Sequence, residues 1–227
     1  MVVLHWLKNK ISAHGKLNSD YLFRHGPYAL ISSVSILIGG TLTAIVLTAL
    51  LPKETYGTYV YLLAVVGMFS SFTASGINNA VTQLTAQGAK NILPSAIALQ
   101  ARWSLPAITG FIIYCGYLYA TGRDGQFIAS LVILGISFFL ASMLCIGGAV
   151  LAGKKEFKKI GLITGFSSAG ACILVGIAAY AGDLITVVGA YAASGLITAA
   201  WLYRAGYGPK NKPPVSAEER RELMRFG

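Results

Sequence analysis

The chain has few charged residues: Asp, Glu, Lys and Arg together make up 11% of its 227 residues. A soluble domain carries about 25% charged residues, so this number could not cover the surface of a soluble protein of this size. Hydrophobic residues make up 55% of the chain, and its mean hydropathy is +0.65. The composition therefore excludes an ordinary soluble fold and leaves little sequence for a soluble catalytic domain.

Groups that carry out catalysis are also scarce in the apolar parts of the chain. All three histidines, His5, His14 and His25, lie near the N-terminus, which leaves the apolar runs without a Ser–His pair or a histidine-rich metal site. Acidic residues occur only in connections and tails, so paired-carboxylate chemistry is unsupported. The sequence has no glycine-rich phosphate loop, and its three cysteines lack metal-ligand spacing. We therefore expect no enzyme activity, no metal and no cofactor.

Six long apolar runs fill most of the chain. A membrane-spanning helix needs about 20 mostly apolar residues, and only helices or closed barrels satisfy their backbone in lipid. Barrel strands would be about 10 residues long and alternate in polarity, so the longer, continuous runs predict helices. We expect an all-α, polytopic membrane protein with six transmembrane helices, at residues 28–51, 56–86, 104–120, 127–152, 160–181 and 184–201.

Positive charge is concentrated on one side of these runs. Sixteen of the 18 Lys and Arg residues lie in the terminal segments, around the second connection or in the fourth, whereas the opposite connections hold only Lys53 and Arg123. Such a surplus can indicate nucleic-acid binding, but the one-sided arrangement favours a membrane protein, and we expect no nucleic-acid partner. Because cytoplasmic loops carry the excess of Lys and Arg, both termini should be cytoplasmic, with basic loops against anionic membrane lipids.

The chain divides into three parts. Residues 1–26 predict an amphipathic segment in the headgroup layer, because Leu4, Leu7 and Ile11 share a helical face. Residues 27–207 form the six-helix transmembrane lobe, and residues 208–227 form a basic cytoplasmic tail or a linker between lobes. The outer connections are short, so consecutive helices should be antiparallel neighbours. Stripes of small residues predict two packing faces: Ser35, Gly39 and Thr43 on one helix, and Gly161, Gly165 and Ala169 on another.

The second run is unusually polar toward its end. Facing lipid, each unsatisfied amide would cost on the order of several kcal/mol, so these side chains must face other helices or water. Interhelical hydrogen bonds, worth about 0.6 kcal/mol each, explain single residues, whereas so many polar groups together favour a hydrated cavity. One helical stripe holds Ser71, Ser75, Asn78, Thr82 and Thr85, and the adjacent stripe holds Asn79, Gln83 and Gln87.

Arg102 precedes the third run. Counting back from Ala120, it lies about 27 Å along the helix, and the hydrocarbon core of a bilayer is about 30 Å thick, so it should lie at the inner interface. Two roles stay open. Its side chain can snorkel to the headgroups, or its guanidinium can bind a phosphate of a lipid-linked substrate that enters from the cytoplasm.

Two motifs stand out within residues 42–87. One is the Leu-Pro-x-Glu-x-Tyr-Gly turn at residues 51–57, and the other is the Gly-Ile-Asn-Asn-Ala-Val-Thr-Gln run at residues 76–83, which is the polar stripe described above. With these motifs, residues 42–87 resemble the first two helices of bacterial polysaccharide and O-antigen flippases, which belong to the multidrug/oligosaccharidyl-lipid/polysaccharide exporter superfamily.

The resemblance implies a protein of the bacterial inner membrane that moves an undecaprenyl-pyrophosphate-linked oligosaccharide to the periplasmic leaflet by alternating access between two lobes. Six helices correspond to the N-terminal lobe, so the gene is truncated, the other half is a separate chain, or two copies pair. Polysaccharide assembly enzymes are further expected partners. The alternatives are a non-transporting scaffold or remnant, and a drug exporter, which the lack of membrane carboxylates disfavours.

Overall fold

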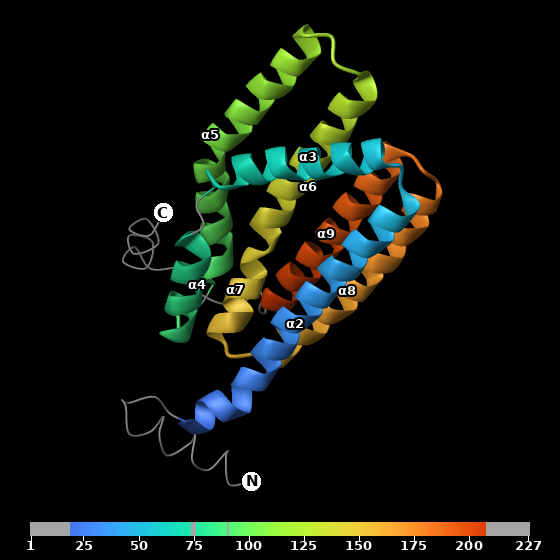
Figure 1. Ribbon diagram of the computed structural model, residues 1–227. Helices are drawn as coiled ribbons and strands as arrows, with labels where there is room; N and C mark the ends of the chain where they lie inside the picture. The colour runs from blue at the N-terminus through green and yellow to red at the C-terminus, as the bar shows by residue number, and fades with distance from the viewer. Residues whose placement is uncertain (1–18, 74–75, 90, 208–227) are drawn as a thin grey trace.

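The computed structural model describes residues 19–73, 76–89 and 91–207, and throughout these ranges the regular secondary structure is helical (Figure 1). The tail at residues 208–227, and residues 1–18 of the expected amphipathic segment, lie outside the described residues. The helices are α2 (Ser19–Leu50), α3 (Lys53–Ser70), α4 (Gly76–Ala86), α5 (Ile92–Ala120), α6 (Gly125–Leu144), α7 (Ile146–Gly153), α8 (Phe157–Tyr180) and α9 (Leu184–Gly206).

Five segments of the described chain are long and apolar enough to cross a membrane. They are Ser33–Leu50 within α2, all of α5, the α6–α7 pair at Gly125–Gly153, α8 and α9. The chain is therefore an all-α, polytopic, membrane-embedded protein, and this part of the prediction is confirmed. Residues 19–26, expected in the interfacial segment, form the first turns of α2, which continues through Pro27.

The second expected span differs from the prediction, because it is not one continuous helix. α3 ends at Ser70, and α4 begins at Gly76. At the break, side chains bond to the backbone: the Ser70 hydroxyl donates to the Gly67 carbonyl and the Thr73 hydroxyl to the Ser70 carbonyl, both at 2.6 Å. Such bonds compete with the helix, and glycine lowers helix propensity on both sides. α3 crosses the other helices and contacts α5, α6 and α9 (Figure 1).

The expectation that consecutive helices are neighbours is wrong for α2. It makes few contacts with α3 and packs mainly along α8, which lies in turn against α9 (Figure 1). The contact uses the predicted small residues Ser35, Gly39 and Gly165, since added Cβ atoms at the two glycines would meet Ser168 and Ser35 respectively. Ala169, predicted on the same stripe, is exposed.

Two apolar clusters form the core. The larger joins α2, α3, α5, α6, α8 and α9 and contains Leu62, Phe111 and Leu131. It approaches the turn end, a name we use for the end of the bundle that holds the α5–α6 and α8–α9 turns. The smaller joins α4, the start of α5, and α7. It approaches the basic end, which holds the lysines of residues 154–159, and it fixes the position of α4.

Candidate functional site

α4 has one apolar face and one polar face. Four of its side chains, Ile77, Ala80, Val81 and Leu84, are at most 4% exposed. They pack against Ile92, Leu93 and Ala96 of α5 and against Ile146 and Val150 of α7. The opposite side of the helix carries Asn78, Asn79 and Gln83, whose side chains are exposed. We call these three residues the α4 polar face, and exposed Gln87 follows it in the next turn.

The threonines of α4 have a different environment. The Thr82 hydroxyl lies 2.9 Å from the Asn78 carbonyl in its own helix and 3.2 Å from the Ala149 carbonyl of α7. An added Cβ at Gly153 would come within 2.6 Å of both the Thr82 carbonyl oxygen and the Thr85 side chain, so α4 and α7 are in close backbone contact. The Thr85 hydroxyl is buried there and has no hydrogen-bond partner within the part of the chain that the structure describes. Thr82 and Thr85 therefore belong to a helix–helix contact.

The first predicted stripe is consequently wrong as a single helical face. The predicted stripe requires residues 71–85 to form one continuous helix. Because the helix is interrupted after Ser70, side chains before and after the break do not follow a single helical periodicity. Ser71 follows α3, and its hydroxyl donates to the Gly67 carbonyl at 3.1 Å. Ser75 lies outside the described residues. Of the predicted residues, the structure brings together the exposed amides of Asn78, Asn79 and Gln83.

Arg102 lies on α5, which begins at Ile92 rather than at the predicted residue 104. Its side chain is exposed, while Gln100 and Ser104 on either side are 6% and 0% exposed. Two residues correspond to about 200° of helical rotation, so Arg102 points away from the packed face of α5. Among the contacts of the described residues, no hydrogen bond or ion pair joins Arg102 to the α4 polar face.

Two buried polar residues on the packed face of α5, Gln100 and Ser104, belong to no pattern in the sequence that predicted a site. The Ser104 hydroxyl has no hydrogen-bond partner among the described residues. The predicted span begins at residue 104, so it does not include Gln100. Asn91 directly before the helix and Pro94 in its first turn are residue types that favour a helix start, and they indicate the observed beginning of α5.

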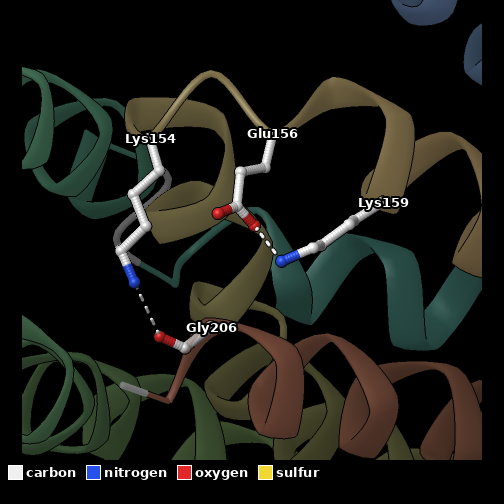
Figure 2. Close-up of polar contacts among 4 residues, drawn as sticks. All are labelled: Lys154, Glu156, Lys159 and Gly206. Atoms are coloured by element: carbon white, nitrogen blue, oxygen red, sulfur yellow. Dashed lines mark hydrogen bonds and ion pairs between the residues drawn. The ribbon is translucent and has the colours of Figure 1, made fainter. Parts of the chain in front are cut away.

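α7, which packs against α4, also packs against α9, the last helix that the structure describes. α7 and α9 pack closely, since an added Cβ at Gly206 would lie 2.6 Å from the Gly147 carbonyl oxygen. Figure 2 shows the connection that follows α7, where the Lys154 amine donates to the Gly206 carbonyl at 3.5 Å. Its neighbour Glu156 forms an ion pair with Lys159 at 2.8 Å. The lysine places a cation at the C-terminus of α9, where the helix dipole favours it.

Comparison with known proteins shows which family the chain is similar to. The model of a family described as polysaccharide biosynthesis protein matches residues 24–227. No curated protein and no solved structure matches the chain. The matched range contains α3 to α9 completely and most of α2. The similarity thus concerns the whole helical bundle rather than the single stretch around the polar run.

Proposed function

Since the chain belongs to the polysaccharide biosynthesis protein family, we propose that it is one lobe of a flippase for lipid-linked oligosaccharide. The family resemblance expected from residues 42–87 is confirmed, and membership supports a role in making or exporting polysaccharide. The finer proposal is that the substrate is an undecaprenyl-pyrophosphate-linked oligosaccharide, moved by alternating access across the bacterial inner membrane. In this arrangement, both termini are cytoplasmic.

The observation that carries the proposal is the exposure of the α4 polar face in a membrane-embedded bundle. An amide that faces lipid without a hydrogen-bond partner costs on the order of several kcal/mol. Packing within the lobe accounts for Thr82, whose hydroxyl contacts α7, but Asn78, Asn79 and Gln83 are exposed on the lobe. They must therefore meet water, substrate or a second lobe. Amides both donate and accept hydrogen bonds, which suits the hydroxyl groups of a sugar.

A second lobe completes the path in this proposal, supplied by another chain or by another copy. The apolar face of α4 is used within the lobe, so the polar face is the side that is available to border a passage. α2 and α8 suit the lipid-facing side, because only 6% of the residues in each spanning window are buried. The alternating-access passage would then lie between the α4 polar face and the second lobe.

Arg102 is the residue that we propose for the phosphate of the substrate. It is the charged residue within the long helix α5, and its side chain is exposed rather than packed. A guanidinium donates two parallel hydrogen bonds to phosphate oxygens. At about 27 Å from the opposite end of the helix, it would meet a pyrophosphate at the inner headgroup layer, where a lipid-linked substrate presents it.

Reconstitution in liposomes tests the proposal. The full chain, alone and with a second-lobe partner, is given a fluorescent lipid-linked oligosaccharide, and movement between leaflets is followed by quenching from outside. We expect movement that falls at least tenfold when Asn78, Asn79 and Gln83 are changed together to Leu. Thr109→Leu is the matched control, because Thr109 is exposed on α5 and its hydroxyl donates to the Leu105 carbonyl of its own helix. No movement in either arrangement would favour the non-transporting scaffold.

A further inference from the structure

A pair of tyrosine hydroxyl groups joins α3 and α5 near the turn end. The hydroxyl oxygens of Tyr61 and Tyr114 lie 2.9 Å apart, although the two residues are 53 positions apart in the sequence. Tyr61 is 49% exposed, and Tyr114 is half-buried. Each phenol has one hydrogen to donate and can also accept hydrogen bonds, and among the described residues neither hydroxyl makes a second one. The pair therefore keeps one donor and further acceptor positions for another partner.

Two phenylalanine rings hold this pair in place. The Phe127 ring of α6 lies 5.9 Å from the Tyr61 ring, and the Phe69 ring of α3 lies 5.9 Å from the Tyr114 ring, measured between ring centres. Phe69, Tyr114 and Phe127 also pack against the larger apolar cluster. Because helices rather than loops carry all four rings, the two hydroxyl groups are presented in a fixed geometry, as a recognition surface requires.

Arg123 adds a cation to the same group of rings. Its guanidinium carbon lies 5.9 Å from the centre of the Phe127 ring, within the distance at which a ring attracts a cation. Phe127 thus contacts both Arg123 and Tyr61. We call Tyr61, Tyr114, Phe127 and Arg123 the aromatic surface. It combines ring faces with a few polar groups, a mixture typical of sites that bind a small organic molecule.

A belt of interfacial tyrosines does not explain the hydroxyl pair. Belt tyrosines lie at the headgroup layer of the membrane, whereas Tyr114 lies about 9 Å along the helix from Ala120, the last residue of α5. Helical side chains incline toward the N-terminus of their helix, which places the Tyr114 hydroxyl deeper still. Facing lipid at that depth, the remaining donor of the pair would cost on the order of several kcal/mol. The pair must therefore face water, substrate or a second lobe.

We propose that the aromatic surface binds the sugar part of the lipid-linked substrate. A sugar ring has faces of C–H groups that pack on the electron-rich face of an aromatic ring, and its hydroxyl groups can donate to and accept from the tyrosine pair. Tyr61 belongs to the same interrupted span as the α4 polar face, because α3 and α4 are the two halves of that span. This inference rests on the proposed function, and it extends the passage toward the turn end.

Binding to the purified full chain in lipid nanodiscs tests the proposal, with saturation-transfer NMR as the readout. The probes are four neutral disaccharides: cellobiose, maltose, lactose and diacetylchitobiose. We expect saturable binding of at least one probe, with saturation concentrated on the C–H protons of one face of a sugar ring. Tyr61→Phe and Tyr114→Phe should each weaken binding about two- to tenfold, the range for one hydrogen bond between neutral groups. Tyr61→Ala, which also removes the ring, should weaken binding further.

Tyr119 provides the matched control. It lies on the same helix as Tyr114 and is 78% exposed, and its side chain makes no hydrogen bond or ring contact with another described residue. Tyr119→Phe and Tyr119→Ala should bind the probes as the unchanged chain does. Each Tyr→Phe variant keeps its ring and its ring packing, and circular dichroism verifies that all variants keep their helical content.

The proposal is overturned if none of the four probes binds saturably, if the Tyr61 variants bind as the unchanged chain does, or if the Tyr119 variants lose as much binding as the Tyr61 variants. The last result would indicate a general effect of interfacial tyrosines. The assay contains no transport step, so a failed liposome experiment would leave a positive binding result intact. Transport without sugar binding would overturn the aromatic-surface proposal alone.

Discussion

The Ser168 hydroxyl of α8 donates a hydrogen bond to the Ser35 backbone carbonyl of α2 at 3.1 Å. This bond joins two helices that are far apart in the sequence, at the point where Gly39 brings the α2 backbone against Ser168. Few other residues of α2 are covered by the bundle, and Leu47 is its one buried residue in the part whose side chains are described. The α2–α8 contact therefore holds α2 to the lobe.

Gly39→Val should detach α2, because the new side chain would overlap Ser168. We expect a loss of about 1–3 kcal/mol in the free energy of unfolding, typical of overpacking, measured by thermal unfolding in detergent. Gly40→Val is the matched control, since no atom lies within 4 Å of an added Cβ there. The smaller change Gly39→Ala should be partly rescued by Ser168→Gly in a double-mutant cycle. Equal effects at Gly39 and Gly40 would contradict the contact.

Gly153→Ala should displace α4 from α7. The added Cβ would come within 2.6 Å of the Thr82 carbonyl oxygen, and backbone cannot move aside as a side-chain tip can. Unfolding should become easier by about 1–3 kcal/mol, and transport should fall with it. Gly148→Ala in the same helix provides the comparison, because its Cβ would meet only Leu202 at an ordinary 3.6 Å. A normal unfolding midpoint for Gly153→Ala would show that α4 and α7 are less closely packed.

Thr82 and Gln83 should respond in opposite ways, although they are adjacent in the sequence. Thr82→Val removes the hydrogen bond to the Ala149 carbonyl and should lower stability by about 0.6 kcal/mol with little effect on transport. Gln83→Leu should leave stability nearly unchanged, because the side chain is exposed, but reduce transport several-fold. Both variants are compared in the same liposome assay and thermal scan. If Gln83→Leu transports normally, its amide has no part in the passage.

Arg102 substitutions separate phosphate binding from snorkelling. Arg102→Gln should reduce transport about tenfold or more, and Arg102→Lys should restore only part of it, because an ammonium cannot make the two parallel hydrogen bonds of a guanidinium. Neither change should affect unfolding, since the side chain is exposed. Initial transport rates over a range of substrate concentrations provide the measurement. Full activity with Lys would instead indicate an interfacial anchor.

The spanning helices could be predicted from the sequence, because length and hydropathy are local properties. The predicted helix boundaries differ from the observed ones where a few residues determine where a helix begins or ends. The break after Ser70 depends on hydroxyl groups that bond to the backbone near Gly67, whereas the helical spacing of Ser71 with the later polar residues predicts one continuous helix. Hydropathy does not predict the start of α5 at Ile92, because the charge of Arg102 interrupts the apolar run within the helix.

Partners across the bundle could not be predicted in the same way. The small-residue stripes identified packing faces on α2 and α8, but no local property tells which face meets which, and the short connection to α3 favoured the wrong neighbour. The site shows the same limit. Asn79 and Gln83 are exposed, whereas the Thr82 hydroxyl contacts α7, and this contact joins residues that are distant in the sequence.

Cysteine labelling of α4 tests the central claim, that its polar face meets water, most directly. In a chain whose native cysteines are replaced, Asn79→Cys and Gln83→Cys are exposed in membranes to a water-soluble, charged thiol reagent. Ile173→Cys on α8, 64% exposed on the lobe and expected in lipid, is the control. We predict rapid labelling at Asn79 and Gln83, slowed by lipid-linked oligosaccharide, and none at Ile173. Labelling at Asn79 and Gln83 as slow as at Ile173 would contradict a hydrated passage.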